Sequence, residues 1–199
     1  MNKILIASNN YGKLKEYHSL LRDFSIEIVY PRQVGITIEV DEVGKSYAEN
    51  AFIKASAFAR AAGMSTLADD SGLEVDALNG LPGIFSARFS PKENANDADR
   101  RKYLLEKLRD KARPWKAKFR CCIAVIHPEK KAQFSEGVCH GEIIPEERGE
   151  NGFGYDPIFF LSQKKCTMAE LSMQEKNQIS HRGLAFLAAK PILEEMFAN

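Results

Sequence analysis

Hydrophobic and polar residues follow two alternating spacings along the chain, which predicts interleaved strands and helices. Residues 2–8, NKILIAS, and residues 26–30, IEIVY, are short apolar runs of the length of buried strands. Between them, residues 12–22 repeat apolar side chains at helical spacing, at Leu14, Tyr17, Leu20 and Leu21. This order of elements is typical of an α/β fold.

A longer helix is predicted over residues 46–62. Ser46 can cap its first turn, Glu49 completes a capping box, and Gly63 stops the helix. The charged sequence of residues 97–111 predicts another helix.

The sequence between these two helices predicts two short strands joined by a turn. Residues 65–70, STLADD, are apolar at first and end in two acids. Ser71 and Gly72 form a turn-like pair, and LEVDAL at residues 73–78 is then expected to be the next strand.

The second half of the chain predicts a hairpin and a final helix. Residues 118–127 and 131–142 flank the turn-like sequence PEK and are expected to pair as antiparallel strands. Residues 180–197 are expected to be helical, with Pro191 kinking or breaking the helix. Together the pattern predicts a mixed central β-sheet flanked by helices in a single domain, residues 1–199.

The composition excludes several classes of function. Apolar residues make up 44% of the chain, and 28 basic against 27 acidic residues give a net charge of +1, so neither a nucleic-acid polymer nor a membrane surface is an expected partner. No stretch approaches the ~20 apolar residues that cross a bilayer. The N-terminal apolar run is too short for a signal peptide, so we expect a cytoplasmic protein. The four cysteines form no CxxC pair and are expected to be reduced thiols.

Two polar clusters follow predicted strands, where α/β folds bind ligands. SNNYGK lacks the first Gly and the final hydroxyl of a phosphate loop, yet it offers Ser8, Asn10 and Lys13 to an anion near a helix start. A capped helix with a solvated lysine fits the same residues. ADDSG offers Asp69 and Asp70, whose oxygens suit Mg²⁺, although an Asp-rich turn fits as well.

Further polar residues precede or lie on the helix at residues 46–62. Asn50 and Lys54 are four residues apart and therefore share a helix face. The preceding loop carries acids that can complete a metal site, at Glu39, Asp41 and Glu42.

Two segments in the last quarter of the chain suit a planar base. In NGFGYDPIFF, glycines surround Phe153 and Tyr155, which can stack on a base or can form a buried aromatic bend. In EKNQISHRGLA, the donors of Lys176, His181 and Arg182 suit phosphate oxygens or the carbonyl edge of a base.

The order of these segments carries more weight than any one of them. SNNYGKLKE, YAENAFIKA, ADDSGLEVDALNGLPGIFSARF, GFGYDPIF and EKNQISHRG closely resemble motifs of the inosine/xanthosine triphosphate pyrophosphatase family, over residues 4–197. The resemblance implies Mg²⁺-dependent hydrolysis of dITP, ITP or XTP to the nucleoside monophosphate and pyrophosphate. It also implies a homodimer and a fold of two lobes with an active-site cleft between them.

The resemblance implies roles for individual residues. Asp70 matches the proton acceptor and Mg²⁺ ligand; Glu39 is the preferred second metal acid, and Glu42 the alternative. The triphosphate turn comprises Ser8, Asn9, Asn10, Tyr11, Gly12 and Lys13. Further substrate contacts are implied for Asn50, Lys54, Ser71, Phe153, Gly154, Tyr155, Asp156, Lys176, His181 and Arg182. Asn9 stands where many family members have glycine.

The expected chemistry agrees with these roles. Asp70 would position and deprotonate a water, while Mg²⁺ and the lysines offset charge on the phosphates. Base donors from Lys176, His181 and Arg182 would be left unpaired against the amino group of adenine, which accounts for rejection of ATP but not of GTP.

Two other functions compete with this one. A Maf-like pyrophosphatase would prefer pyrimidine or modified nucleotides, but the SHR cluster and the FGYD loop favour the purine branch. A nucleotide sensor would bind without hydrolysis, and the acids Asp69, Asp70 and Glu39 argue against it.

Overall fold

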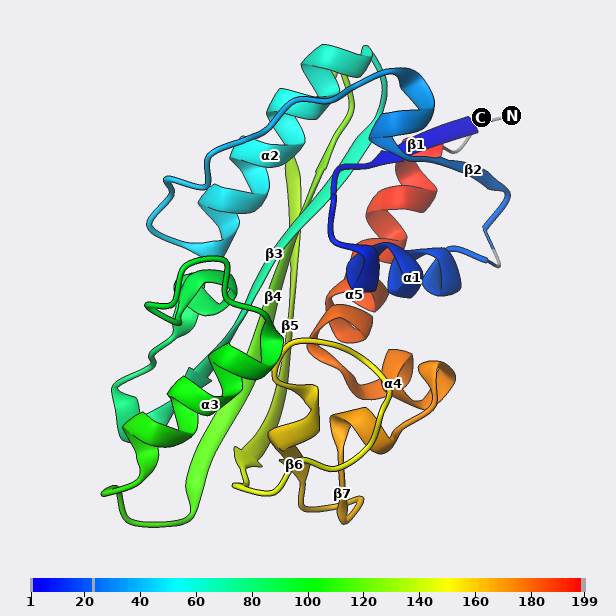
Figure 1. Cartoon of the computed structure of the whole chain (residues 1–199). Helices are drawn as coiled ribbons and strands as arrows, with labels where there is room; N and C mark the ends of the chain where they lie inside the picture. Colours follow the sequence, from blue (N-terminus) through cyan, green and yellow to red (C-terminus); the bar gives the residue numbers. More distant parts are fainter. Residues whose placement is uncertain (1, 23, 198–199) are drawn as a thin grey trace. The chain divides into compact units, whose positions relative to one another are not determined.

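The computed structural model describes residues 2–22 and 24–197. Seven strands form one sheet in the order β2-β1-β3-β4-β5-β6-β7 (Figure 1). The chain divides into two compact units. The first contains the described residues of Met1–Asp70, Cys121–Gly137 and Arg182–Asn199, and the second contains Ser71–Arg120 and Val138–His181. Within the described ranges, no helix has both the length and the apolar character needed to cross a membrane.

The first unit is built around a parallel strand. β1 lies between β2 and β3 and runs parallel to both, with Leu5 opposite Val29 on one side and Thr66 on the other. The elements of this unit are β1 (Asn2–Ile6), α1 (Tyr11–Leu20), β2 (Ile26–Val29), η1 (Pro31–Val34), α2 (Tyr47–Ala62), α5 (His181–Phe197) and parts of β3 (Thr66–Val75), β4 (Trp115–Ile126) and β5 (Gln133–Ile143).

Alternation along β1 creates a core on each face of this part of the sheet. Ile4 and Ile6 pack with α1 and α5, in a cluster that includes Tyr17 and Phe186. Leu5 and the following Ala7 pack with α2 instead, in a cluster that includes Ala51, Ala55 and Phe58. Successive strand residues point to opposite faces, so one apolar strand supports helices on both sides.

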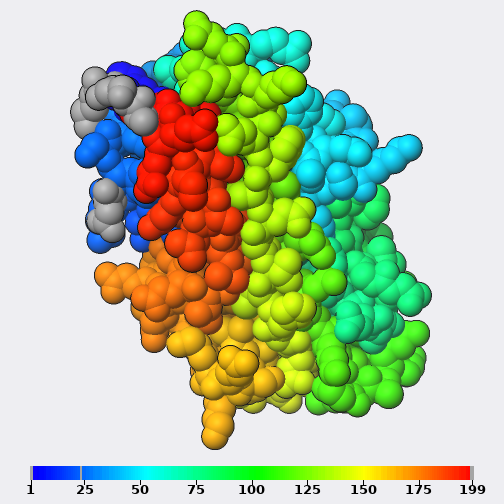
Figure 2. Space-filling model, turned by 180° about the vertical axis from the view of Figure 1, so that it is seen from behind, coloured from blue at the N-terminus to red at the C-terminus, as the bar shows by residue number. Residues whose placement is uncertain are grey.

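The C-terminal helix α5 lies beside the first part of β5. Figure 2 shows α5 in red along the yellow-green strand segment, and the Ser135 hydroxyl donates to the Ala185 carbonyl at 2.9 Å. α5 continues through Pro191, so Pro191 does not break the helix, and the kink stays a prediction.

The ends of α2 largely follow the sequence prediction. The Ser46 side chain caps the helix by accepting from the Glu49 amide, and Gly63 ends it in the left-handed conformation. Glu49 accepts from the Lys45 amide at 2.6 Å, one residue before the amide that a capping box uses.

The second unit has its own apolar core and shorter elements. β5 pairs with β6 and β6 with β7, all antiparallel. Its core gathers Leu104 and Leu108 of α3 with Trp115, Phe119 and Phe159. The elements are the remaining parts of β3, β4 and β5, with η2 (Asp76–Leu78), η3 (Gly83–Arg88), α3 (Asp97–Leu108), η4 (Asp156–Ile158), β6 (Phe159–Leu161), β7 (Cys166–Thr167), η5 (Met168–Glu170) and α4 (Met173–Ile179).

The mixed sheet is confirmed, but the turn predicted at Ser71 and Gly72 is wrong. β3 is one continuous strand over Thr66–Val75, and both residues lie inside it. Turn-forming residues stay in a strand when the neighbouring strands supply partners for their backbone groups. The predicted hairpin strands, β4 and β5, are neighbours in the sheet. All four cysteines are free thiols, as predicted. The single domain and the two-lobed cleft stay predictions.

Candidate active site

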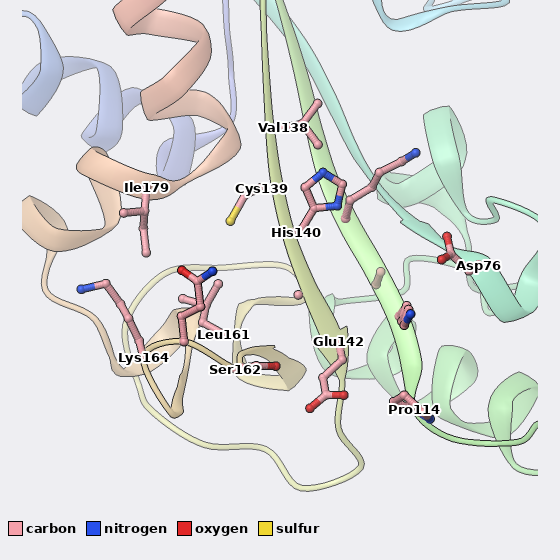
Figure 3. A pocket seen from close by; sticks show the side chains of 15 residues that line it. Asp76, Pro114, Val138, Cys139, His140, Glu142, Leu161, Ser162, Lys164 and Ile179 are labelled. Atoms are coloured by element: carbon pink, nitrogen blue, oxygen red, sulfur yellow. The ribbon is translucent and has the colours of Figure 1, made fainter.

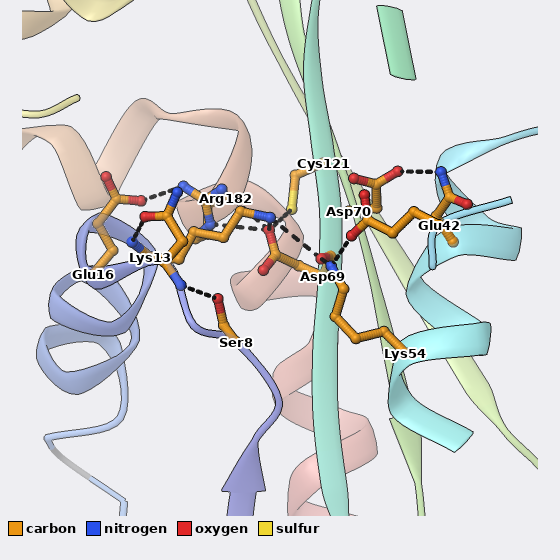
Figure 4. A network of polar contacts seen from close by, with 11 residues as sticks. Ser8, Lys13, Glu16, Glu42, Lys54, Asp69, Asp70, Cys121 and Arg182 are labelled. Carbon is orange, nitrogen blue, oxygen red and sulfur yellow. Dashed lines mark hydrogen bonds and ion pairs between the residues drawn. The ribbon is translucent and has the colours of Figure 1, made fainter. Parts of the chain in front are cut away.

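Asp69 and Asp70 lie in the middle of β3, and not at its end as the sequence suggested. They therefore point to opposite faces of the strand. In Figure 4, Asp69 points towards α1 and α5, and Asp70 towards α2. Both carboxylates are buried, at 1% and 5% exposed. One strand thus supplies two acids to two different surroundings.

Asp69 is the centre of a buried ion cluster. Its Oδ2 lies 3.0 Å from Lys13 Nζ and accepts from Arg182 Nε and Nη2 at 3.2 and 3.1 Å. The Cys121 thiol donates to the same oxygen at 3.6 Å. Arg182 is fully buried and also donates from Nη1 to Glu16 at 2.5 Å. Two carboxylates and two cations therefore balance each other, and of these four groups only Lys13 is partly exposed.

The lysines of two helices converge on one backbone atom. Lys13 of α1 and Lys54 of α2 both donate to the Asp69 carbonyl, at 3.3 and 3.1 Å. The two ammonium groups therefore lie within two hydrogen-bond lengths of each other. Lys54 also forms an ion pair with Glu42. This arrangement can hold a polyanion between two cations.

Asp70 has a different environment from Asp69. Its Oδ2 accepts from Asn50 Nδ2 at 2.9 Å. Burial raises the pKa of Asp70; the charge of Glu42 adds to the rise, and Lys13 opposes it. A carboxyl group with a raised pKa is a better proton acceptor than an ordinary one.

The pKa of Asp69 is shifted in the opposite direction from that of Asp70. Burial alone would raise the pKa of Asp69, but Lys13 and Arg182 hold it well below its ordinary value. Adjacent acids with opposite pKa shifts usually have different roles. Asp69 fits a permanent anion that orders the cations, and Asp70 fits a base.

The SNNYGK turn begins α1. Asn10 is the N-cap: its Oδ1 accepts from the Lys13 amide at 3.1 Å, and its own amide donates to Ser8 Oγ at 3.2 Å. The capped helix considered above is therefore present, but Lys13 is not a solvated lysine. The exposed Asn9 and Tyr11 line a cavity of ≈ 620 Å³ beside the turn.

The positions of the acids in the loop before α2 decide which of them can share a metal ion with Asp70. Glu42 is partly buried and contacts Lys54, whereas Glu39 is exposed. Over residues 2–22 and 24–197, no group of three or more His, Cys, Asp or Glu side chains is arranged to hold a metal. Asp70 and Glu42 are oxygen donors whose mutual repulsion a divalent cation would relieve, so they fit Mg²⁺ completed by substrate oxygens. The geometry favours Glu42 over Glu39.

Of the residues predicted to contact the base, the second unit contains Phe153, Lys176 and His181. Arg182 instead belongs to the first unit, where it pairs with Asp69 and Glu16. Asp156 Oδ2 accepts from the Phe153 amide at 2.9 Å and from Lys176 Nζ at 2.5 Å. The Lys176 ammonium lies 5.0 Å from the centre of the Phe153 ring. A buried cation and an aromatic face are therefore held together by one carboxylate, an arrangement suited to a planar, oxygen-bearing ligand.

Neighbouring contacts fix the rest of this loop. Gly152 has a φ of 77°, and a Cβ there would lie 2.1 Å from Asp156 Oδ2, so only glycine fits. The Tyr155 hydroxyl donates to the Ser86 carbonyl at 2.9 Å. The His181 ring stacks on Phe119 with ring centres 4.7 Å apart.

A separate cavity of ≈ 650 Å³ in the second unit contains none of the predicted site residues (Figure 3). It is lined by Asp76, Pro114, Lys116, Ala117, Lys118, Val138, Cys139, His140, Gly141, Glu142, Leu161, Ser162, Gln163, Lys164 and Ile179.

Comparison with known proteins supplies the family. The model of the Ham1 family matches residues 4–192. The chain belongs to the Ham1 family.

Its relatives match over nearly their whole length. A dITP/XTP pyrophosphatase of Desulforamulus reducens is 44% identical, over 99% of this chain and 98% of that protein. A dITP/XTP pyrophosphatase of Bacillus anthracis is 43% identical over the same shares. The solved structure of a HAM1 protein from Coxiella burnetii has a TM-score of 0.88 and 42% identity, covering 98% of this chain and 100% of that one.

The structure adds residues to this Ham1 site that the sequence did not predict. Glu16 and Cys121 join Asp69, and Arg182 pairs with both carboxylates of that cluster. The spacing of Lys13 and Glu16 places them on one face of α1, which is a weak signal. Nothing in the sequence indicates that Glu16 is buried, since buried glutamates are rare.

Proposed function

We propose that this Ham1 protein hydrolyses dITP, ITP and XTP to the nucleoside monophosphate and pyrophosphate. The observation that carries the proposal is the convergence of Lys13 and Lys54 on the Asp69 carbonyl, beside an Asp70 with a raised pKa. Cations for a triphosphate and a base for water thus lie side by side. Relatives named dITP/XTP pyrophosphatases over 99% of the chain support the same substrates.

Asp70 is the general base in this proposal. It takes a proton from water while the water oxygen bonds to the α-phosphorus. The bond from that phosphorus to the oxygen bridging to the β-phosphorus then breaks, and pyrophosphate leaves with the electron pair. Lys13 and Lys54 offset the charge that accumulates on the leaving group. Asp69 stays ionised and keeps the lysines in place.

Asp70 and Glu42 are the residues that would hold Mg²⁺. When bound, the ion would supply additional positive charge at the phosphates. Asn50 holds Asp70 in place through the 2.9 Å bond to its carboxylate.

Residues of the second unit would recognise the base. Phe153 offers a ring for stacking, and Lys176 and His181 supply donors for the 6-oxo group of hypoxanthine and xanthine. Adenine presents an amino group at that position and would leave these donors unpaired, at a cost of ~1–3 kcal/mol each. We also propose that the protein is a cytoplasmic homodimer.

A pyrophosphate-release assay with Mg²⁺ tests the proposal. Rapid release is expected from dITP and XTP, with little from dGTP, dATP, dTTP or UTP. Preference for dTTP or UTP would instead assign the protein to pyrimidine nucleotides. Tight nucleotide binding without pyrophosphate release would overturn the proposal and favour a nucleotide sensor that does not hydrolyse its ligand.

The variant Asp70→Asn tests the mechanism. It removes the base and keeps the shape of the side chain, so most turnover should be lost while dITP binding largely survives. Full activity in Asp70→Asn would exclude Asp70 as the base.

A further inference from the structure

Both backbone polar groups of Gly154 are held by side chains of α3. The Gly154 amide donates to Asp97 Oδ2 at 2.7 Å, and Arg101 Nη1 donates to the Gly154 carbonyl at 2.8 Å. Asp97 and Arg101 are four residues apart on a helix and therefore share one face. α3 thus presents an acceptor and a donor to the two polar groups of one loop residue.

These contacts act on Phe153. The Phe153 amide donates to Asp156, and the next amide along the chain, that of Gly154, donates to Asp97. The first bond restricts φ of Phe153 and the second restricts ψ. The direction of the Phe153 ring is then determined by its own rotamer alone.

Further contacts hold the two α3 side chains in place. Asp97 lies in the first turn of α3, where the helix dipole favours a carboxylate, and accepts from Arg100 at 2.6 Å. Arg101 makes two parallel bonds to Glu147, both 2.8 Å long. A guanidinium held in a fork in this way has little remaining freedom. Each bond to Gly154 is also charge-assisted, which makes it stronger than a neutral one.

We propose that Asp97 and Arg101 are positioning residues for base recognition: they hold the Phe153–Gly154 backbone, and through it the ring on which the purine stacks. They do not touch the reacting phosphates. This inference rests on the proposed function, since it assigns a task to residues outside the substrate contacts of that function.

The variant Asp97→Ala removes the acceptor of the Gly154 amide, and the variant Arg101→Met removes the donor to the Gly154 carbonyl. Each should raise KM for dITP about tenfold, because a hydrogen bond to a charged group is lost. Each should leave kcat within about threefold, because the phosphate contacts are intact. The preference for dITP over dGTP should fall, and inhibition by tripolyphosphate, which has no base, should not change.

Asp99→Ala is the matched control. Asp99 accepts from the Asn96 amide and pairs with Lys92, so this variant weakens the start of α3 without touching Gly154. It should keep the wild-type KM and selectivity. If Asp99→Ala raised KM as much as Asp97→Ala, the effect would come from helix stability, and the proposal would be wrong.

The outcomes separate this inference from the proposed function. No pyrophosphate release from dITP by the wild-type protein would overturn the proposed function and this inference with it. An active wild type with unchanged KM and selectivity in Asp97→Ala and Arg101→Met would overturn the positioning role alone. Thermal unfolding of each variant identifies any that fails to fold, and either variant is sufficient for the test.

Discussion

The polar residues around Asp69 and the loop around Gly154 use opposite means to fix a functional side chain. Around Asp69, charged side chains from three regular elements, β3, α1 and α5, neutralise one another in a buried cluster. Around Gly154, charged side chains hold backbone groups of a loop with left-handed glycines. In the first region the charged groups are themselves the functional groups. In the second region charged groups fix the backbone conformation of a loop.

The difference predicts different consequences of mutation. A buried cluster of compensating charges is costly to break, because an ion left without its partner is desolvated and unpaired. Breaking the partly exposed hydrogen bonds that hold a loop should reduce stability only slightly, but the ring that the loop positions then moves. Changes near Asp69 should therefore affect stability and turnover, and changes near Gly154 should affect substrate choice.

The largest contrast is expected between two arginine substitutions. Arg182→Met leaves Glu16 and Asp69 short of a cation and should destabilise the protein by about 3–5 kcal/mol. Arg101→Met breaks a pair with the half-exposed Glu147 and one backbone contact and should cost about 1 kcal/mol. Urea denaturation measures both.

Arg182→Lys sharpens this comparison. It keeps the charge but loses the fork that reaches both carboxylates, so its stability should lie between those of wild type and Arg182→Met. Equal losses in Arg182→Met and Arg101→Met would contradict the contrast between the two regions.

The second contrast is between a phosphate contact and a base contact. Lys13→Met should lower kcat/KM for dITP about a hundredfold or more, since it removes a cation from the leaving group. It should also weaken inhibition by tripolyphosphate. Phe153→Ala should raise KM for dITP and leave that inhibition unchanged.

A single measurement decides this second contrast. The ratio of tripolyphosphate inhibition constants for Lys13→Met and Phe153→Ala should be well above one. Equal inhibition constants for the two variants would show that the triphosphate and base contacts are not separable as proposed.

The sequence predicted the elements of this fold better than the surroundings of their polar residues. Apolar periodicity located β1, α1 and α2, because these elements bury one or both faces in a core. It failed at Ser71 and Gly72, which lie inside the continuous strand β3 despite their turn propensity. Local preference is weak evidence where tertiary pairing satisfies the backbone.

The site was predicted in part. Spacing alone placed Asn50 and Lys54 on one helix face, and the family resemblance implied Asp70 and the lysines as site residues, whose roles stay predictions. Neither gave the pairing of Glu16 with Arg182, which joins residues 166 positions apart. Such a contact depends on which helices pack on the same face of a sheet, and periodicity does not contain that information.

The contacts of α3 escaped prediction for the same reason. Asp97 and Arg101 look like ordinary charged residues of a solvated helix. Only the position of Gly154 against α3 shows that both side chains form hydrogen bonds with the backbone of Gly154. Residues that bind backbone groups need no special pattern, since any loop offers an amide and a carbonyl.

The smallest contrast is within the loop itself, between its two glycines. Gly154→Ala meets open space and should cost only backbone strain, about 1 kcal/mol at its φ of 64°. Gly152→Ala adds a Cβ that would lie 2.1 Å from Asp156 Oδ2, the atom that holds Phe153 and Lys176. It should therefore cost more stability and also raise KM for dITP. Thermal unfolding and dITP kinetics of the two variants measure the difference. If Gly154→Ala were the more harmful change, backbone strain at Gly154 and not the position of Asp156 would control the loop.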